Sequence, residues 1–125
     1  MSVRVLIADD HELVRRGLRS LLESRPGWEI CGEARDGIEA VEMSKALVPD
    51  IILLDITMPR LNGLDAARRI RQEVPRTQIL ILSQHDIEEM SESALKAGAR
   101  GYVSKSEVAV TLFSSMETIL HSAND

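Results

Sequence analysis

The sequence predicts an α/β fold in which helices cover both faces of a parallel sheet of five strands. Short, continuous apolar runs alternate with segments in which apolar residues recur at helical spacing. Uninterrupted apolar runs are typical of strands buried on both faces, and right-handed crossovers place helices over both faces of a parallel sheet. With 125 residues, 44% of them hydrophobic, the chain can form one core but not two ordinary domains.

The first strand is expected at Val3–Ala8, a β-branched apolar run that ends abruptly at Asp9 and Asp10. A helix is expected from His11 onward, because apolar residues recur with helical spacing until Pro26 and Gly27 close the segment. Asp10 has a second interpretation, because an aspartate at this place can cap the helix.

The second strand is predicted at Trp28–Ala34, and Asp36 is placed to cap a helix that stops before Pro49. The run from Ile51 to Leu54 is the most apolar in the chain and ends on Asp55. It is therefore expected to be a central, fully buried strand.

The same alternation continues to the end of the chain. After the loop Thr57–Gly63, a helix is expected that ends near Pro75, and the strand at residues 79–82 then ends on Ser83. Residues 87–97 carry a helical stripe, residues 101–103 form a short strand that ends near Lys105, and residues 112–120 mark a last helix.

Charge and composition limit the classes of partner. The formal net charge of −5 and the pI near 5.2 provide no basic surface for nucleic-acid phosphates, so proteins or small ions are the expected partners. A single cysteine, Cys31, cannot form an internal disulfide and is expected to be a small buried hydrophobe. Because no apolar run approaches the ~20 residues of a membrane span and no signal peptide is apparent, we expect a cytoplasmic protein without a membrane partner.

Polar side chains stand at the carboxyl ends of four predicted strands. They are Asp9 and Asp10, Asp55, Ser83 and Lys105. Ligands of open α/β sheets bind outside the carboxyl ends of the strands. These side chains are therefore expected to meet at one edge of the sheet.

Three neighbouring carboxylates, from Asp9, Asp10 and Asp55, repel one another unless a cation compensates. Oxygen ligands without histidine or cysteine favour Mg²⁺, which usually shares its coordination with a phosphate. A carboxylate can accept a phosphoryl group, and Asp55 is the best candidate because it stands alone at the end of the central strand. Each acid taken alone can be a solvated loop residue or a helix cap, but their combination with Ser83 and Lys105 indicates a phosphoryl site.

The chain resembles the receiver domain of bacterial two-component response regulators over essentially its whole length. The matching motifs are the apolar strand into Asp9 and Asp10, the stretch from Asp55 to Gly63, Ser83 after residues 79–82, and the stretch from Ala97 to Lys105. The resemblance implies a flavodoxin-like, doubly wound (βα)5 fold with strand order 2-1-3-4-5.

The resemblance also implies a role for each site residue. A sensor histidine kinase would phosphorylate Asp55. Mg²⁺ would be bound by Asp10, Asp55 and the backbone carbonyl of Thr57, and Asp9 would act through metal-bound water. Ser83 and Lys105 would contact the phosphoryl oxygens, and Tyr102 would be the aromatic side chain whose rotation, with Ser83, reports the switch.

The segment from His11 to Leu18 looks like that of the NarL/FixJ, or LuxR-type, branch, whose members carry a C-terminal helix-turn-helix domain. We therefore expect a receiver domain at residues 1–121, with residues 122–125 beginning a linker to an absent domain that binds DNA and regulates transcription. A stand-alone receiver is the alternative. The exposed polar pattern of Glu88, Glu89, Glu92 and Lys96 suggests a face that meets a partner or a second copy.

Several of these residues have plainer interpretations. Tyr102 near a strand end is commonly part of the core with a wet hydroxyl, and Ser83 can cap a helix that opens at Asp86. His11 and His85 are expected to be exposed loop residues, because no metal-ligand spacing involves them. The methionines Met58, Met90 and Met116 are expected to fill the core.

Two rival functions are disfavoured, and two positions depart from the family pattern. An aspartate-nucleophile phosphohydrolase needs a general acid two residues after the nucleophile, and Thr57 cannot serve, so we expect a signalling switch rather than an enzyme. A degenerate receiver used only for docking is disfavoured because all the key side chains are present. Gln84 stands where a small residue is usual, and Ser106 stands where many receivers have proline.

Overall fold

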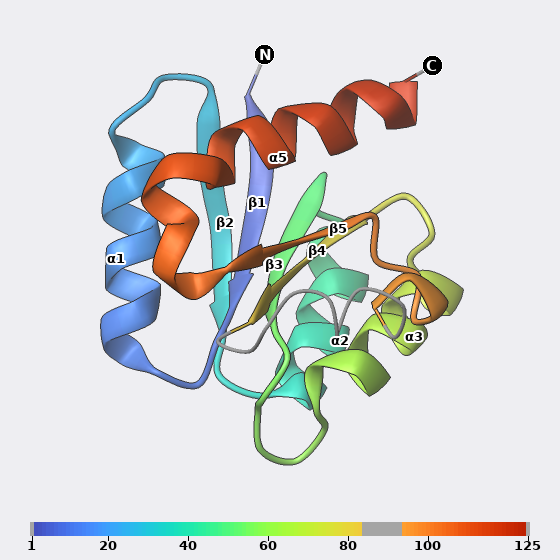
Figure 1. The fold of residues 1–125 in the computed structure, drawn as a ribbon. Coiled ribbons are helices and arrows are strands. Elements are labelled where there is room, and N and C mark those ends of the chain that lie inside the picture. The colour runs from blue at the N-terminus through green and yellow to red at the C-terminus, as the bar shows by residue number, and fades with distance from the viewer. Residues whose placement is uncertain (1, 84–93, 125) are drawn as a thin grey trace.

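The computed structural model describes residues 2–83 and 94–124, and the predicted sheet is present (Figure 1). Its five strands are all parallel and lie in the order β2-β1-β3-β4-β5. The strands are β1 Val3–Ala8, β2 Trp28–Ala34, β3 Ile51–Asp55, β4 Gln78–Ser83 and β5 Gly101–Ser104. The strands deviate from their predicted bounds by at most one residue at either end, and the predicted order is confirmed.

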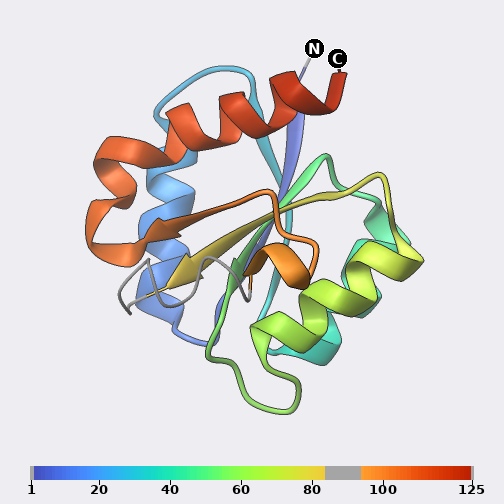
Figure 2. The same cartoon turned by 45° about the vertical axis from the view of Figure 1, so that its right-hand side comes forward.

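Helices lie on both faces of this sheet, as predicted. The described helices are α1 Glu12–Glu23, α2 Gly37–Leu47, α3 Gly63–Glu73 and α5 Val108–Asn124, with a 3-10 turn, η1, at Lys105–Glu107. Figures 1 and 2 show α1 and α5 on one face and α2 and α3 on the other. None of the helices in the described part of the chain is long and apolar enough to cross a membrane.

The core is divided by the sheet into two layers because successive side chains of a strand point to opposite faces. Leu6 and Ile52 belong to the layer under α2 and α3, and Ile7 and Leu53 belong to the layer under α1 and α5. All four are fully buried, and burying each aliphatic side chain of this size stabilises the fold by about 1.5–3 kcal/mol. This double burial explains why the strands read as continuous apolar runs.

The helix starts confirm one predicted cap and exclude another. The Asp36 carboxylate accepts a hydrogen bond of 2.9 Å from the backbone N–H of Glu39, so Asp36 caps α2 as predicted. The N-cap residue of α1 is His11, which makes no side-chain capping bond. The interpretation of Asp10 as the cap of this helix is therefore wrong, and its carboxylate is available to the site.

The structure also shows how deeply two methionines, Cys31 and Tyr102 are buried. Met58 and Met116 are buried in the core, which confirms their role as core filler. Cys31 is only half-buried; it packs against the core, and burial raises the pKa of its thiol. Tyr102 is also half-buried and packs against the layer under α2 and α3.

Some predictions fall on residues 84–93, outside the described residues. They concern the helical stripe through Ile87 and Met90, the departure at Gln84, the loop histidine His85 and the cap at Asp86. The glutamates of the proposed partner face, Glu88, Glu89 and Glu92, also lie there. The chain is described again from Ala94, which is buried like Ala97.

The carboxyl-terminal part of the chain is helical through Asn124. This helix extends three residues past the predicted domain boundary at residue 121. That residues 122–125 begin a linker stays a prediction.

Candidate functional site

The predicted site residues meet at one edge of the sheet, at the carboxyl ends of the strands. In Figure 1 the loops that follow β1 and β3 lie at the lower end of the sheet, opposite the labels N and C. Asp9 and Asp10 directly follow β1, Asp55 and Ser83 are the last residues of β3 and β4, and Lys105 directly follows β5. The topology that was predicted for the sheet thus brings side chains from four strands together.

The carboxylates form a compact acidic cluster. Asp9 is 0% exposed and Asp55 is 1% exposed, whereas Asp10 is partly open to solvent. Ligand atoms from Asp9, Asp10, His11 and Asp55 all lie within 4.8 Å of one another. Burying several carboxylates so close together is unfavourable without a compensating cation.

Lys105 provides part of that compensation. Its ammonium nitrogen lies 2.8 Å from Asp9 Oδ2 and 3.1 Å from Asp55 Oδ1, and the lysine side chain is only 10% exposed. Both contacts are close ion pairs. Burial alone would lower the pKa of Lys105, but the two carboxylates outweigh it and the pKa lies above its ordinary value. The ammonium therefore stays charged at neutral pH.

One lysine does not balance the cluster. The pKa of Asp55 is raised, first because burial disfavours the charged form and then because the Asp9 carboxylate repels it, although Lys105 opposes both effects. Asp55 Oδ2 is buried and has no hydrogen-bond partner among the described residues. A buried carboxylate oxygen of this kind, beside two further carboxylates, fits a hard divalent cation such as Mg²⁺.

The loop after β3 positions Asp55 through its own backbone. The backbone N–H of Thr57 donates to Asp55 Oδ1 at 3.3 Å, and the N–H of Gly63 donates to the carbonyl of Ile56 at 3.0 Å. A Cβ on Gly63 would lie 2.1 Å from the Asp55 carbonyl oxygen. Only glycine allows α3 to start this close to the end of β3.

A tight turn at Arg60 completes this loop. Arg60 has a φ of 68°, and the N–H of Leu61 donates to the carbonyl of Pro59 at 2.8 Å. The Arg60 guanidinium pairs at 3.2 Å with the Asp36 carboxylate that caps α2. Positive φ is uncommon for a residue with a side chain, and such conformations are concentrated at functional sites.

Ser83 and Tyr102 lie on neighbouring strands. Ser83 is 2% exposed at the end of β4, where it is paired in register with Ser104 of β5. Tyr102 is paired with Ile81, on the same two strands. The structure thus places Ser83 at the predicted edge, and the switch roles of both residues stay predictions.

Two contributors to this edge were not identified from the sequence. His11, expected to be an exposed loop residue, is 60% exposed, but its Nδ1 lies 3.1 Å from Asp10 Oδ1 and 3.3 Å from Asp9 Oδ1. Arg15 is buried and donates to the backbone carbonyl of Asp9 at 2.7 Å. The one signal in the sequence was an arginine on the apolar face of an expected helix, one turn after the acids.

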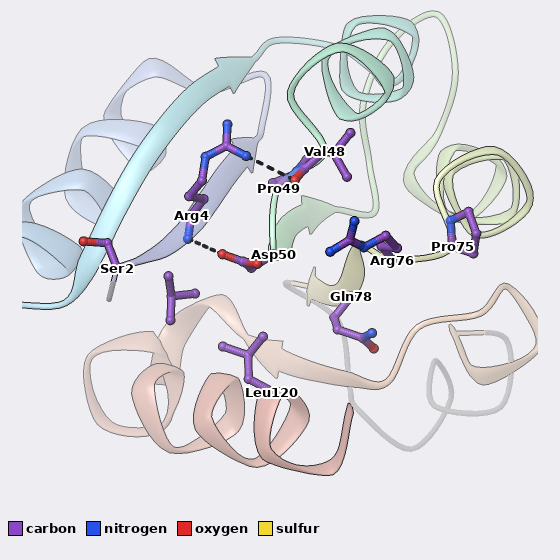
Figure 3. Close-up of a pocket in the computed structure, with 10 residues that line it drawn as sticks. Ser2, Arg4, Val48, Pro49, Asp50, Pro75, Arg76, Gln78 and Leu120 are labelled. Atoms are coloured by element: carbon purple, nitrogen blue, oxygen red, sulfur yellow. Dashed lines mark hydrogen bonds between the residues drawn. The ribbon is translucent and has the colours of Figure 1, made fainter. Parts of the chain in front are cut away.

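A hollow lies elsewhere, at the opposite edge of the sheet (Figure 3). It has a volume of about 840 Å³ and is bordered by residues such as Arg4, Asp50, Arg76 and Leu120. Here the Arg4 guanidinium donates to the carbonyl of Leu47 at 2.6 Å, at the end of α2. Because Asp9, Asp10 and Asp55 do not line this hollow, it is not part of the candidate site.

Comparison with known proteins gives consistent results. Residues 5–117 match the family described as the response regulator receiver domain. The chain is 38% identical over 117 residues to the transcriptional regulatory protein DegU of Brevibacillus brevis, covering 94% of this chain and 50% of DegU. It is 42% identical over 112 residues to a protein-glutamate methylesterase/protein-glutamine glutaminase of Pyrococcus abyssi, covering 88% of this chain and 30% of that protein.

A solved structure agrees with these relatives. The crystal structure of a two-component response regulator of the LuxR family from Aurantimonas sp. SI85-9A1 superposes with a TM-score of 0.92 at 38% identity. The match covers 98% of this chain and 87% of that one. The chain thus spans about half the length of DegU and less than a third of the methylesterase relative.

Proposed function

The chain belongs to the response regulator receiver domain family, and from this premise we propose that Asp55 is its phosphoryl acceptor. The observation that carries the proposal is the state of Asp55: its carboxylate is buried, has one oxygen without a hydrogen-bond partner in residues 2–83 and 94–124, and lies 3.1 Å from the Lys105 ammonium. A carboxylate held in this way is aligned beside a fixed positive charge, which is the main requirement of phosphoryl transfer.

The donor is a phosphohistidine of a sensor histidine kinase. A carboxylate oxygen of Asp55 attacks phosphorus, the phosphorus–nitrogen bond to the histidine breaks, and an acyl phosphate forms. The histidine nitrogen leaves with the bonding electron pair and takes up a proton. Lys105, already charged beside Asp55, stabilises the negative charge on the transferred group, and Ser83 donates its hydroxyl to a phosphoryl oxygen.

Receiver domains generally bind Mg²⁺, and the acidic cluster of this chain can hold a divalent cation. We propose Asp10, Asp55 and the Thr57 carbonyl as ligands, with Asp9 acting through bound water. When bound, the ion supplies charge neutralisation for the phosphoryl oxygens. The buried Asp55 Oδ2, which finds no hydrogen-bond partner in the part of the chain that the structure describes, supports this assignment.

The phosphorylated chain acts as a switch. The new group adds nearly two negative charges next to Ser83 and Lys105, on the ends of β4 and β5. Both residues are drawn toward it, which biases the loops after these strands and the position of Tyr102 on β5. The output is proposed to be transcription, through a DNA-binding domain beyond this chain, in the cytoplasm, with a second copy as a candidate partner. Relatives named as transcriptional regulators support this output.

The chain is proposed to be a signalling switch and not a turnover phosphatase. A phosphatase that uses an aspartate nucleophile needs a general acid near the leaving group. The nearest hydroxyl on the loop is Thr57 Oγ1, 3.5 Å from Asp55 Oδ1, and a threonine hydroxyl cannot donate a proton efficiently at neutral pH.

Incubation with acetyl phosphate tests the proposal. Intact mass spectrometry is expected to show the gain of one phosphoryl group on the wild type with Mg²⁺, and no gain with EDTA or with Asp55→Asn. Asp65→Asn, which changes a half-exposed acid on α3, is the matched control. Equal phosphorylation of the wild type and Asp55→Asn would refute the assignment.

A further inference from the structure

The backbone that carries the first two acids of the site is held from both sides. The N–H of Asp9 donates to the carbonyl of Ala34 on β2 at 3.1 Å. The carbonyl of Asp9 accepts from Arg15 Nη1 at 2.7 Å, in a contact that is buried. This carbonyl belongs to the peptide unit that joins Asp9 to Asp10, so Arg15 fixes the plane from which both acidic side chains project.

Arg15 is itself held in place. It is 8% exposed on α1, and its Nε lies 3.3 Å from Glu33 Oε1 on β2. The second oxygen of Glu33 pairs with Arg19, one turn further along α1. The planar guanidinium of Arg15 thus makes two contacts in fixed directions, one to Glu33 and one to Asp9, which a lysine ammonium can reproduce only in part.

We propose that Arg15, held by Glu33, is a positioning residue of the divalent-cation site and sets the orientation of the Asp9–Asp10 pair. The inference rests on the proposed function, because the cation concerned is the Mg²⁺ of phosphoryl transfer. Partners that orient metal ligands without touching the ion typically change metal affinity by about 10- to 100-fold when they are removed.

The sign of the effect separates this role from a charge effect. A buried positive charge near the site repels Mg²⁺, so removing it for electrostatic reasons alone would tighten cation binding. Loss of positioning has the opposite result. Arg15→Met removes the charge and both contacts while keeping the length of the side chain, and it is therefore expected to weaken Mg²⁺ binding.

The experiment measures Mg²⁺ dissociation constants of the metal-free full chain by isothermal titration calorimetry. Arg15→Met is expected to bind about tenfold more weakly than the wild type, and Arg15→Lys, which keeps a donor and the charge, is expected to recover part of the loss. Arg19→Met is the matched control, because Arg19 contacts Glu33 but makes no contact with Asp9 among the described residues. Its affinity should equal that of the wild type.

The outcomes distinguish a failure of the positioning role of Arg15 from a failure of the proposed function. Unchanged or tighter binding by Arg15→Met, no recovery by Arg15→Lys, or an equal loss in Arg19→Met would overturn the positioning role. If the wild type itself bound no Mg²⁺, the proposed function would fail first. If circular dichroism shows that Arg15→Met does not fold, Glu33→Gln replaces it; Mg²⁺ binding about threefold weaker is then expected, and unchanged binding would refute the role.

Discussion

Replacing the buried Asp55 by asparagine should make the metal-free protein more stable, although it removes the proposed acceptor. The pKa of Asp55 lies above its ordinary value of 3.8 because of burial and the nearby Asp9 carboxylate. A raised carboxyl pKa means that the group's contribution to stability is fully present below the ordinary value. That contribution is lost as the pH rises through the folded-state value. At neutral pH the wild type therefore carries an unfavourable charge that asparagine lacks.

The size of this gain in stability can be estimated from the contacts of Asp55. Burying a polar atom without a hydrogen-bond partner costs about 1–3 kcal/mol, and Asp55 Oδ2 has none among the residues that the structure describes. The variant also loses the ion pair with Lys105, whose ammonium keeps its 2.8 Å contact with Asp9. We expect a net gain of about 1 kcal/mol at pH 7, or roughly 4 °C in Tm for a domain of this size.

Urea unfolding in EDTA, followed from about pH 4 to about pH 8, measures this gain. The difference in the free energy of unfolding between Asp55→Asn and the wild type should grow with pH and then stay constant. Glu117→Gln, an exposed acid on α5, should show no such trend. A variant less stable than the wild type at pH 7, or a difference that does not depend on pH, would refute this account of the site's electrostatics.

Two further substitutions test the geometry of the site. Gly63→Ala places a Cβ 2.1 Å from the Asp55 carbonyl, and we expect a loss of about 1–3 kcal/mol in urea unfolding; a loss below about 0.5 kcal/mol would contradict the close approach. Lys105→Met leaves the carboxylates of Asp9 and Asp55 without their ammonium, so we expect a lower Tm in EDTA and a larger rise in Tm on adding Mg²⁺ than in the wild type. An equal rise in both proteins would show that Lys105 does not compensate the charge of these carboxylates.

Most of the fold was predictable because the three central strands, β1, β3 and β4, are buried on both faces. The bounds of β3 could be predicted because its apolar residues are followed directly by Asp55, where the chain reaches the polar edge of the sheet. The cap at Asp36 was predictable for a similar reason, because it depends on a bond to a residue three positions away. The strand order depends on contacts between distant segments. It was therefore predicted only from the resemblance to a family.

The candidate site was predictable where the backbone alone determines proximity. Parallel strands deliver their last residues to one edge, so Asp9, Asp55 and Lys105 had to be neighbours. Side-chain direction was not predictable in the same way. Whether His11 turns toward the acids or toward solvent, and whether Arg15 reaches back to β1, depends on rotamers and packing that sequence spacing does not specify.

Chemical trapping of the acyl phosphate tests the central claim most directly. After treatment with acetyl phosphate and Mg²⁺, borohydride reduces an aspartyl phosphate to homoserine, and peptide mass spectrometry then locates the modified position. We predict homoserine at position 55 and none at positions 9 or 10. Homoserine at either of the other acids, or unmodified aspartate at all three positions after treatment under conditions that label another receiver domain, would contradict the assignment of Asp55 as the acceptor.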